Sequence, residues 1–527
     1  MPNNFTDILI EDLSFDEKLE DIDFDLLTVF NMLKRVPNKN SNSPDGIPYI
    51  LIKKCADQLA PIVTELFRII LDEGNIPPIW KTSFIVPIFK KGDPSSPGNY
   101  RPISLTCTFC RIFERILVKK MVEFLNRINF FNKEQFGFLK KRSTTTQLLT
   151  MLEDFYNAIQ RGENIDVIYI DFAKAFDTVP IDLLLKKLKN IGFEGKIFQF
   201  LKNFLTDRSF RVKIGDTFSD PYQTLSGVPQ GSVLGPILFL IFINDLPKCL
   251  PDGIGFKIYA DDLKIYVTYK DETRKELLKT ALHKIEKWSN DNGLKISSEK
   301  SMALYIGKQN QNTPYSLCEE IIPREECVKD LGILIDSELS FSQHINKVIK
   351  SSYLAANQIL KIMKTRDLKT LIFAYKTYVR PLLEYATETW NPHKKSDINR
   401  IEKIQKFYTR RAFKKCGLVP LPYEKRLDQC GIQKLTKRRK IADLVMTQKI
   451  LTGQTHLPPQ KYFSKTVRAH RKPLLLQNRK CTSKTQRNFF IRIVSLWNKL
   501  PKQAMEFFDS KDFRKLTTEL DLSGLVG

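Results

Sequence analysis

The sequence predicts an α+β fold in its middle part and a helical fold toward its C-terminus. Short, nearly continuous apolar runs at 165–171, 255–262 and 263–267 have the composition of buried strands. Segments with helical periodicity surround them, and from about residue 366 onward the pattern is mainly helical and increasingly basic. Strand and helix signals alternate in the first part of the chain, which indicates an α+β fold there. Only helix signals follow, which indicates a helical C-terminal part.

The elements are expected in the following order. Residues 7–25 are strongly acidic and predict either a linker or a lead-in helix with a solvated face. Residues 37–46 carry turn chemistry. A strand at 84–89 runs into Lys90, Lys91 and Gly92. Helical periodicity is expected at 50–71, 111–128, 271–291 and 341–363.

The size and charge of the chain suit a folded protein with a polyanionic partner. Its 527 residues allow two to four domains. Lys and Arg number 84 against 59 acidic residues, a net charge of +25, which favours nucleic acid or an acidic membrane surface over a merely basic soluble protein. The longest apolar run, Ile237 to Ile243, is far below the ~20 residues of a membrane span, so we expect a buried element there and no membrane partner.

The nine cysteines are scattered, and this distribution argues against two classes of site. The one close pair, Cys107 and Cys110, has no second pair or nearby histidine at zinc-like spacing. We therefore expect neither a zinc site nor a disulfide framework. No signal peptide opens the chain. These features predict an intracellular protein of the nucleus or cytoplasm that is not secreted.

Three aspartates lie at the ends of strand-like segments. Asp171 ends the first segment, and Asp261 and Asp262 lie between the second and the third, where a tight hairpin would place them. If the strands are neighbours, the carboxylates converge and repel one another unless cations bind. Mg²⁺ prefers such oxygen ligands together with substrate phosphates. Two ions ~3.5–4 Å apart can activate a 3′-hydroxyl and stabilise a leaving pyrophosphate. The alternative for Asp261 and Asp262 is a solvent-exposed turn.

Nine motifs in chain order decide between these alternatives. They are SPDGIP (43–48), IPPIWKTSFIVPIFKKGD (76–93), NYRPISL (99–105), EQFGFLKKRSTTTQL (134–148), YIDFAKAFDTV (169–179), SGVPQGSVLGPILFLIFINDLP (226–247), YADD (259–262), NGLKISSEKS (292–301) and LGILID (331–336). With them, the chain resembles the reverse transcriptase of non-LTR (LINE-type) retrotransposons, in the jockey-like and chicken-repeat-like groups. The resemblance covers roughly residues 40–345 and continues more weakly to about 500.

The resemblance implies a right-hand polymerase with fingers, a palm containing an antiparallel sheet, and a helical thumb. The expected divisions are an acidic lead-in or linker (1–42), fingers (43–164), palm (165–340), thumb (341–450) and a helical, basic C-terminal extension (451–527). In the thumb, the basic segments 400–415 and 434–440 would follow a phosphate backbone. Their aromatics Phe407, Tyr408 and Phe413 are expected in the core, and KRRK (437–440) also fits a nuclear localisation signal.

The same resemblance assigns catalytic roles to the carboxylates. Asp171 and Asp261 would bind two Mg²⁺ ions, for which Mn²⁺ could substitute. Asp262 would be the supporting third catalytic carboxylate. Asp177 is interpreted instead as a cap of the helix that follows the strand.

The remaining site residues would bind the incoming nucleotide. Phe176 would lie beneath its sugar and exclude a 2′-hydroxyl, the alternative being a core phenylalanine. The other expected contacts to the nascent base pair, the triphosphate or the leaving pyrophosphate are Gln230, Gly231, Arg101, Lys90, Lys91 and Lys300. For Lys90, Lys91 and Lys300 the alternative is an exposed surface lysine.

The implied activity is RNA-directed DNA polymerisation. The partners would be an RNA template, a DNA or RNA primer and deoxynucleoside triphosphates. The fingers motifs begin near residue 43, so no endonuclease domain is expected, and the chain would be a fragment of an element's second reading frame or a separately encoded copy. The alternatives are a catalytically decayed remnant that binds nucleic acid, and a telomerase-like or intron-maturase polymerase. SGVPQGSVLGPILF and NYRPISL disfavour the maturase.

Overall fold

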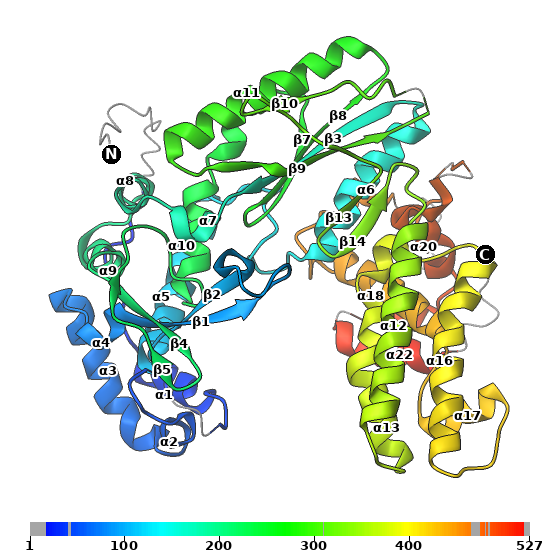
Figure 1. Cartoon of the computed structure of the whole chain (residues 1–527), viewed down its shortest axis with the longest axis horizontal. Coiled ribbons are helices and arrows are strands. Elements are labelled where there is room, and N and C mark those ends of the chain that lie inside the picture. The colour runs from blue at the N-terminus through cyan, green and yellow to red at the C-terminus, as the bar shows by residue number, and fades with distance from the viewer. Residues whose placement is uncertain are drawn as a thin grey trace.

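The computed structural model describes residues 17–39, 44–308, 310–464, 475–479, 481–482, 485–507 and 509–520. The ribbon is arched (Figure 1). N-terminal helices and a small sheet form one end, C-terminal helices form the other, and a central sheet lies between them.

The described part of the acidic N-terminal segment is extended chain that is docked on the protein. Leu19 forms a parallel bridge with Phe193. Asp21 pairs with Lys196 at 2.9 Å, and residues 17–24 contain no helix. The expected lead-in helix is therefore wrong for these residues, and residues 1–16 lie outside the described residues.

Helices and a small sheet make up the N-terminal part. The predicted helix over 50–71 is two helices that meet at Cys55. The helices are α1 (Leu26–Lys34), α2 (Tyr49–Lys54), α3 (Ala56–Glu73), α4 (Pro78–Lys81) and α5 (Thr108–Arg127). The strands are β1 (Thr82–Phe89), β2 (Tyr100–Leu105), β4 (Ser209–Ile214), β5 (Thr217–Phe218) and β6 (Tyr222–Gln223). β1 pairs with β2 antiparallel and with β4 parallel, so a distant segment of the chain returns to complete this sheet.

The central sheet has the strand order β12-β9-β3-β8-β7. The predicted strands near 165–171, 255–262 and 263–267 are confirmed as β3, β7 and β8, which are antiparallel neighbours. The strands are β3 (Asn164–Phe172), β7 (Gly255–Tyr259), β8 (Asp262–Tyr269), β9 (Ile296–Ile306) and β12 (Arg324–Glu325). Two short hairpins follow β9 and flank β12, namely β10 (Ser316–Leu317) with β11 (Glu320–Ile321) and β13 (Cys327–Asp330) with β14 (Ile333–Asp336).

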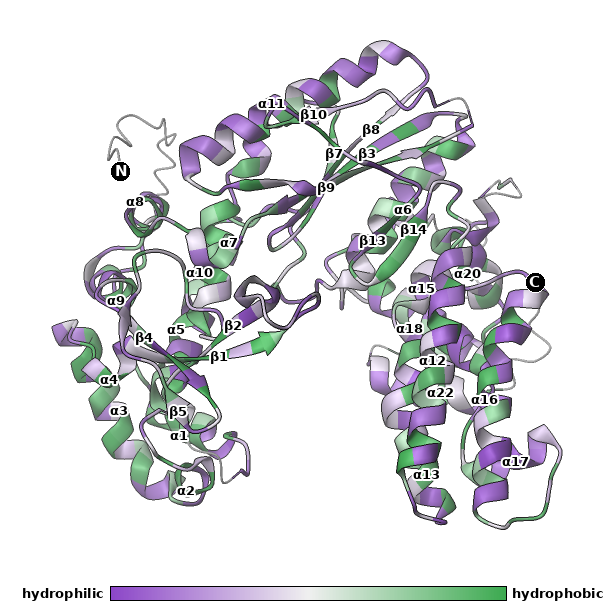
Figure 2. Ribbon diagram, viewed as in Figure 1, coloured by the Kyte–Doolittle hydropathy of each residue, from purple (hydrophilic) through white to green (hydrophobic). Residues whose placement is uncertain are grey.

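Helices cover both faces of this sheet because alternate residues of each strand point to opposite sides. Val167 belongs to the apolar cluster shared with α6, whereas Ile168 belongs to the cluster shared with α10 and α11. α10 contains the predicted buried run at 237–243, and every residue of that run is buried, as expected. Figure 2 shows a largely hydrophilic outer side on α11. The helices are α6 (Thr144–Gln160), α7 (Ala175–Thr178), α8 (Ile181–Ile191), α9 (Gly195–Leu205), α10 (Leu234–Ile243) and α11 (Lys275–Asn292). The mixture of helices and an antiparallel sheet confirms the α+β class.

The C-terminal part of the described chain is helical, as predicted. Its helices are α12 (Ser342–Ile362), α13 (Leu368–Ala374), a π-helical turn (Tyr375–Val379), α14 (Arg380–Glu384), α15 (Thr387–Trp390), α16 (Lys395–Lys415), α17 (Tyr423–Cys430), α18 (Leu435–Leu451), α19 (Pro459–Tyr462), α20 (Phe489–Asn498), α21 (Lys502–Met505) and α22 (Ser510–Glu519). Tyr408 and Phe413 are buried and Phe407 is partly buried against the same core, which confirms their predicted role.

The basic run at 437–440 is not the open cationic surface that the sequence suggested. Arg438 donates to both carboxylate oxygens of Glu384. Arg439 is 2% exposed. Arg438 and Arg439 are thus held within the fold, and the prediction that they would follow a phosphate backbone is wrong for these two residues.

The described residues after α18 pack on the rest of the chain through an apolar cluster that includes Leu149 of α6. The Glu153 carboxylate, also on α6, accepts from Arg479 at 2.5 Å and from Asn488 Nδ2 at 2.6 Å. The C-terminal extension is therefore joined to the central part by both apolar and charged contacts.

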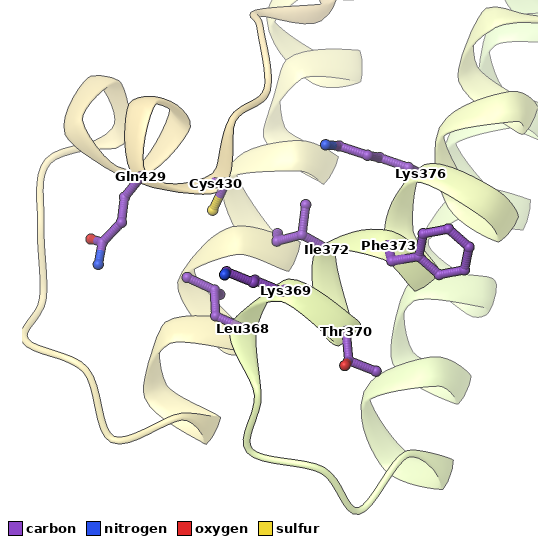
Figure 3. Close-up of a pocket in the computed structure, with 8 residues that line it drawn as sticks. All are labelled: Leu368, Lys369, Thr370, Ile372, Phe373, Lys376, Gln429 and Cys430. Atoms are coloured by element: carbon purple, nitrogen blue, oxygen red, sulfur yellow. The ribbon is translucent and has the colours of Figure 1, made fainter.

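No helix among the described residues is long and apolar enough to cross a membrane. All nine cysteines are free thiols. A surface pocket of about 470 Å³ lies at α13 and α17, at the end of the C-terminal helices farthest from the central sheet (Figures 1 and 3). It is lined by Leu368, Lys369, Thr370, Ile372, Phe373, Lys376, Gln429 and Cys430. None of the predicted site residues lines this pocket.

Candidate active site

A two-residue hairpin carries the acidic pair. Tyr259 of β7 lies opposite Asp262 of β8, so Ala260 and Asp261 form the turn between them. Ala260 has a φ of 58°. This left-handed conformation disfavours residues with a Cβ, so the surrounding contacts must hold the turn in place. The predicted tight hairpin is confirmed.

The end of β3 brings Asp171 next to this turn. β3 and β8 are antiparallel, and Ile170 pairs with Leu263, so the following residue of β3 lies beside the start of β8. Burial raises the pKa of Asp261 above its ordinary value, and the negative charge of Asp171 raises it further. The two carboxylates therefore interact in space, although they lie far apart in the sequence.

Asp262 is the more exposed member of the pair. Desolvation by the protein around its carboxyl group nevertheless raises the pKa of Asp262 to about 6, and the charge of Asp261 adds to this effect. The ammonium group of Lys264 opposes the shift. Asp262 thus belongs to the same electrostatic cluster as Asp261.

The donor set can be compared with what a divalent cation requires. Within the part of the chain that the structure describes, no three His, Cys, Asp or Glu side chains form a ready-made metal cluster. Asp171 at the end of β3 and Asp261 in the β7–β8 turn provide hard oxygen donors, and their mutual repulsion is the feature that a cation relieves. Mg²⁺ commonly binds one or two carboxylates and completes its shell with waters and substrate phosphates. The residues present fit such an ion.

An irregularity in β9 brings Lys300 to the same place. Tyr169 pairs with Met302, but Asp171 pairs with Ser297, so residues 298–301 bulge out of the ladder. Lys300 Nζ lies 3.6 Å from Asp171 Oδ2. The Lys300 side chain is 64% exposed, so it contacts the carboxylate without being buried.

Phe176 lies in the short helix α7 that follows β3. Its ring stacks on Phe239 of α10, with the ring centroids 4.3 Å apart and the planes at 14°. The exposed Phe138 meets it edge-on at 6.2 Å. Phe176 is partly buried, so one part of the ring is fixed by the core and another part faces solvent.

The loop that contains Gln230 and Gly231 docks on β2. Ser104 N–H donates to the Gln230 carbonyl at 2.6 Å. Gly231 has a φ of 116°, and a Cβ there would lie 2.5 Å from the Ser104 carbonyl oxygen. Glycine is therefore required at 231 for the close approach of two backbones.

Asp177 does not cap a helix, contrary to the sequence interpretation. Lys174 occupies the N-cap of α7, and Asp177 lies inside the helix. The Asp177 carboxylate accepts from Gln230 Nε2 at 3.2 Å. Desolvation raises the pKa of Asp177. The hydrogen bond between Asp177 and Gln230 connects α7, which also carries Phe176, to the loop that follows β6.

The predicted cations lie around the β1–β2 connection. Arg101 pairs with Ile88 in the β1–β2 ladder, and Lys90 follows β1 directly. The charges of Lys90 and Arg101 both lower the pKa of Asp261, so these two cations act on the carboxylate cluster. Lys91 is exposed in the bend after β1.

Sequence reasoning missed one buried acid that shapes this region. Glu114 of α5 is fully buried, and its carboxylate accepts from the backbone N–H groups of Val233 at 2.7 Å and Leu234 at 2.8 Å, at the start of α10. A negative charge is favourable at a helix N-terminus. The available signal was an acid placed directly between apolar and basic residues in the helical pattern of 111–128, next to Phe113.

Comparison with known proteins defines the class. Residues 88–335 match the family model described as reverse transcriptase (RNA-dependent DNA polymerase). By this match, residues 88–335 are similar to the reverse transcriptase domains of RNA-directed DNA polymerases.

The particular relatives come from mobile elements. The chain is 28% identical to the RNA-directed DNA polymerase from mobile element jockey of Drosophila melanogaster, over 72% of this chain and 42% of the relative. It is 28% identical to the probable RNA-directed DNA polymerase from transposon BS of the same species, over 72% of this chain and 43% of the relative. It is 27% identical to the probable RNA-directed DNA polymerase from transposon X-element of that species, over 72% of this chain and 43% of the relative. The resemblance to the polymerases of non-LTR retrotransposons is thus confirmed.

The chain spans less than half the length of these curated relatives. Among solved structures, an apo telomerase from Candida Tropicalis, truncated from its C-terminal domain, matches with a TM-score of 0.37 and 13% identity. That match covers 50% of this chain and 55% of the telomerase chain, and it is too distant to support a functional argument.

Proposed function

We propose that the chain is an RNA-templated DNA polymerase of a non-LTR retrotransposon, which extends a DNA or RNA 3′ end with deoxynucleotides. The observation that carries the proposal is the electrostatic pairing of Asp171 on β3 with Asp261 in the β7–β8 turn, inside a domain that matches the reverse transcriptase family. Two strand-end carboxylates in one cluster are the arrangement that phosphoryl transfer with divalent cations requires.

The proposed architecture is a right hand, with fingers at 43–164, palm at 165–340 and thumb at 341–450, between the acidic lead-in (1–42) and the C-terminal extension (451–527). The presence of an N-terminal sheet, a central sheet and C-terminal helices supports this proposal, although β4 to β6 pair with the N-terminal sheet. RNA template and primer would lie between fingers and thumb, consistent with the net charge of +25.

Asp171 and Asp261 would hold two Mg²⁺ ions, with Mn²⁺ as a possible substitute, and Asp262 would support them. When bound, these ions would lower the pKa of the primer 3′-hydroxyl and neutralise charge on the leaving pyrophosphate. The protein itself contributes fixed carboxylates, since the β3–β8 ladder and the tight turn leave them little freedom.

The other residues would bind and orient the nucleotide. Arg101, Lys90 and Lys91 would attract its triphosphate. Lys300 would hold a proton near the leaving group, supported by its contact with Asp171. Gln230 and Gly231 would line the nascent base pair, and their loop is fixed on β2 by the backbone contact with Ser104.

Primer extension tests the proposal directly. Purified protein, a primer annealed to an RNA template, deoxynucleotides and Mg²⁺ should give a fully extended product. Omission of Mg²⁺ should abolish it. If the protein binds primer–template but extends nothing, the chain is instead a remnant that binds nucleic acid without catalysis.

Replacement of Phe176 tests the proposed sugar selection. Phe176→Val should raise ribonucleotide incorporation relative to deoxynucleotide incorporation by about 10–100-fold, because a smaller side chain leaves room for the 2′-hydroxyl, a steric discrimination of a few kcal/mol. Single-nucleotide incorporation with matched rNTP and dNTP measures the ratio. Phe30→Val is the matched control, because Phe30 on α1 is likewise partly buried against the core, and this variant should keep the wild-type ratio. Equal ratios in wild type and Phe176→Val would reject the steric role.

A further inference from the structure

The segment 134–138 lies beside β7, the outer strand of the central sheet. Phe136 N–H donates to the Ile258 carbonyl at 2.8 Å, and Ile258 N–H donates to the Glu134 carbonyl at 2.9 Å. These two bonds form a parallel bridge centred on Gln135. The segment therefore covers the edge of β7 just before the turn that carries Asp261.

The Gln135 side chain reaches from this segment into the turn. It is 3% exposed. Its Oε1 accepts from Ala260 N–H at 3.0 Å and from Gly137 N–H at 2.8 Å. Ala260 N–H is the backbone donor at the first position of the turn, directly before Asp261, and Ala260 is only 4% exposed. Without Gln135 this buried donor would lose its partner.

The turn depends on such support because of its backbone conformation. Ala260 adopts a φ of 58°, which is unfavourable for a residue with a Cβ. Conformations of this kind persist only where surrounding contacts determine them. The Gln135 amide oxygen is a direct side-chain contact to the Ala260 backbone.

Gly137 allows the segment to lie directly on the turn. A Cβ at position 137 would be 2.6 Å from Ala260 N and 3.2 Å from Ala260 Cα. Any larger residue would push the two backbones apart. The next residue, Phe138, is 53% exposed and meets the Phe176 ring edge-on, so the same short segment contacts both the carboxylate turn and Phe176.

Arg142 anchors the segment from the other side. Its Nη1 donates to the carbonyls of Asn132 at 2.7 Å and Lys133 at 3.2 Å, and also to the Gln135 carbonyl. One guanidinium thus holds the backbone on both sides of Glu134. The amide oxygen of Gln135 is presented by a rigid support and not by a freely moving loop.

We infer that Gln135 is a positioning residue for the carboxylate cluster: its amide oxygen fixes the Ala260–Asp261 turn, and thereby the place of the Asp261 carboxylate relative to Asp171. Gln135 contacts the backbone of the turn and no reacting atom. The inference rests on the proposed polymerase function for its catalytic consequence, but its structural part can be measured without catalysis.

The test compares Gln135→Met with wild type. Methionine keeps the length and apolar volume of the side chain and removes the acceptor. We expect the rate constant of nucleotide incorporation, per titrated active site, to fall about 10–100-fold, because a small displacement of a catalytic group has effects of this size. The dissociation constants of primer–template and nucleotide should change less than about threefold, since the Gln135 side chain is buried and its amide oxygen accepts from backbone N–H groups of the protein.

Gln448→Met is the matched control. Gln448 is equally buried, at 1% exposure, and donates to the Phe507 carbonyl at 3.0 Å in the C-terminal part. This variant loses a buried amide elsewhere and should keep the wild-type rate per active site. If both variants lost the incorporation rate per active site equally, Gln135 would contribute only to general stability, and the inference would be overturned.

Hydrogen exchange separates this inference from the proposed function. In Gln135→Met the amide of Ala260 should exchange faster than in wild type, while β3 keeps its protection. If wild type extends no primer, the proposed function fails, yet faster exchange at the turn would still support the positioning role. Unchanged exchange at Ala260 would overturn the inference whatever the activity.

Discussion

Asp261→Asn should reduce primer extension at least ~10³-fold and leave primer–template binding nearly unchanged. Asparagine has the size and shape of aspartate but carries no charge, so a metal-binding contribution of several kcal/mol to the transition state is lost at constant packing. Single-turnover incorporation measures the rate, and fluorescence anisotropy of a labelled primer–template measures binding.

The same substitution should not destabilise the fold. The pKa of Asp261 is raised in the folded protein, first by burial and then by Asp171, so at neutral pH its ionised form opposes folding. Removing that charge should leave the melting temperature equal or higher. A lower melting temperature would mean that the loss of activity reflects unfolding.

Asp252→Asn is the control for this experiment. Asp252 is an exposed aspartate three residues before β7, at the opposite end of the strand from the turn. It should retain full extension. If Asp261→Asn also retained extension, the carboxylate assignment would be wrong.

Lys264→Met should destabilise the folded protein by about 3–5 kcal/mol, the cost of leaving one charge of a buried ion pair without its partner. Lys264 on β8 and Asp330 on β13 form an ion pair in which the side chains are 1% and 3% exposed. Methionine preserves the aliphatic stem of lysine, so the change isolates the charge. Urea denaturation of wild type and Lys264→Met measures the decrease in the free energy of unfolding.

The double variant Lys264→Met/Asp330→Leu should recover most of this stability. A pair of apolar side chains in the same place has no unpaired charge to desolvate. The single variant Asp330→Leu completes a double-mutant cycle, and a coupling free energy below about 1 kcal/mol would show that the two charges do not act as a pair.

Local patterns in the sequence identified the parts of the site that local structure determines. The apolar runs of β3, β7 and β8 and the turn chemistry between Tyr259 and Asp262 are short-range signals, and the structure has these elements where they were expected. Family motifs added Lys90 and Arg101, whose charges do reach Asp261.

The sequence could not reveal features that depend on pairing between distant segments. The bulge that brings Lys300 to Asp171 arises from the register of β9 against β3, and no residue within the bulge gives a sequence signal for it. Asp177 resembled a helix cap because it lies near a helix start, but its partner Gln230 comes from a loop far along the chain. The role of Gln135 could not be predicted for the same reason, since its amide oxygen accepts from Ala260 N–H only when the segment 134–138 lies beside β7.

The return of β4 to the N-terminal sheet has a consequence for synthesis of the protein. β1 is one of the first strands to leave the ribosome, but its parallel partner β4 begins only at Ser209. At typical elongation rates of 5–20 residues per second, β1 waits on the order of ten seconds with one edge unpaired. During that interval Phe84 and Ile85, which pair with Arg211 and Val212 of β4 in the finished protein, lack a neighbour on that edge. The nascent chain is therefore expected to need a chaperone over this interval more than the finished protein does.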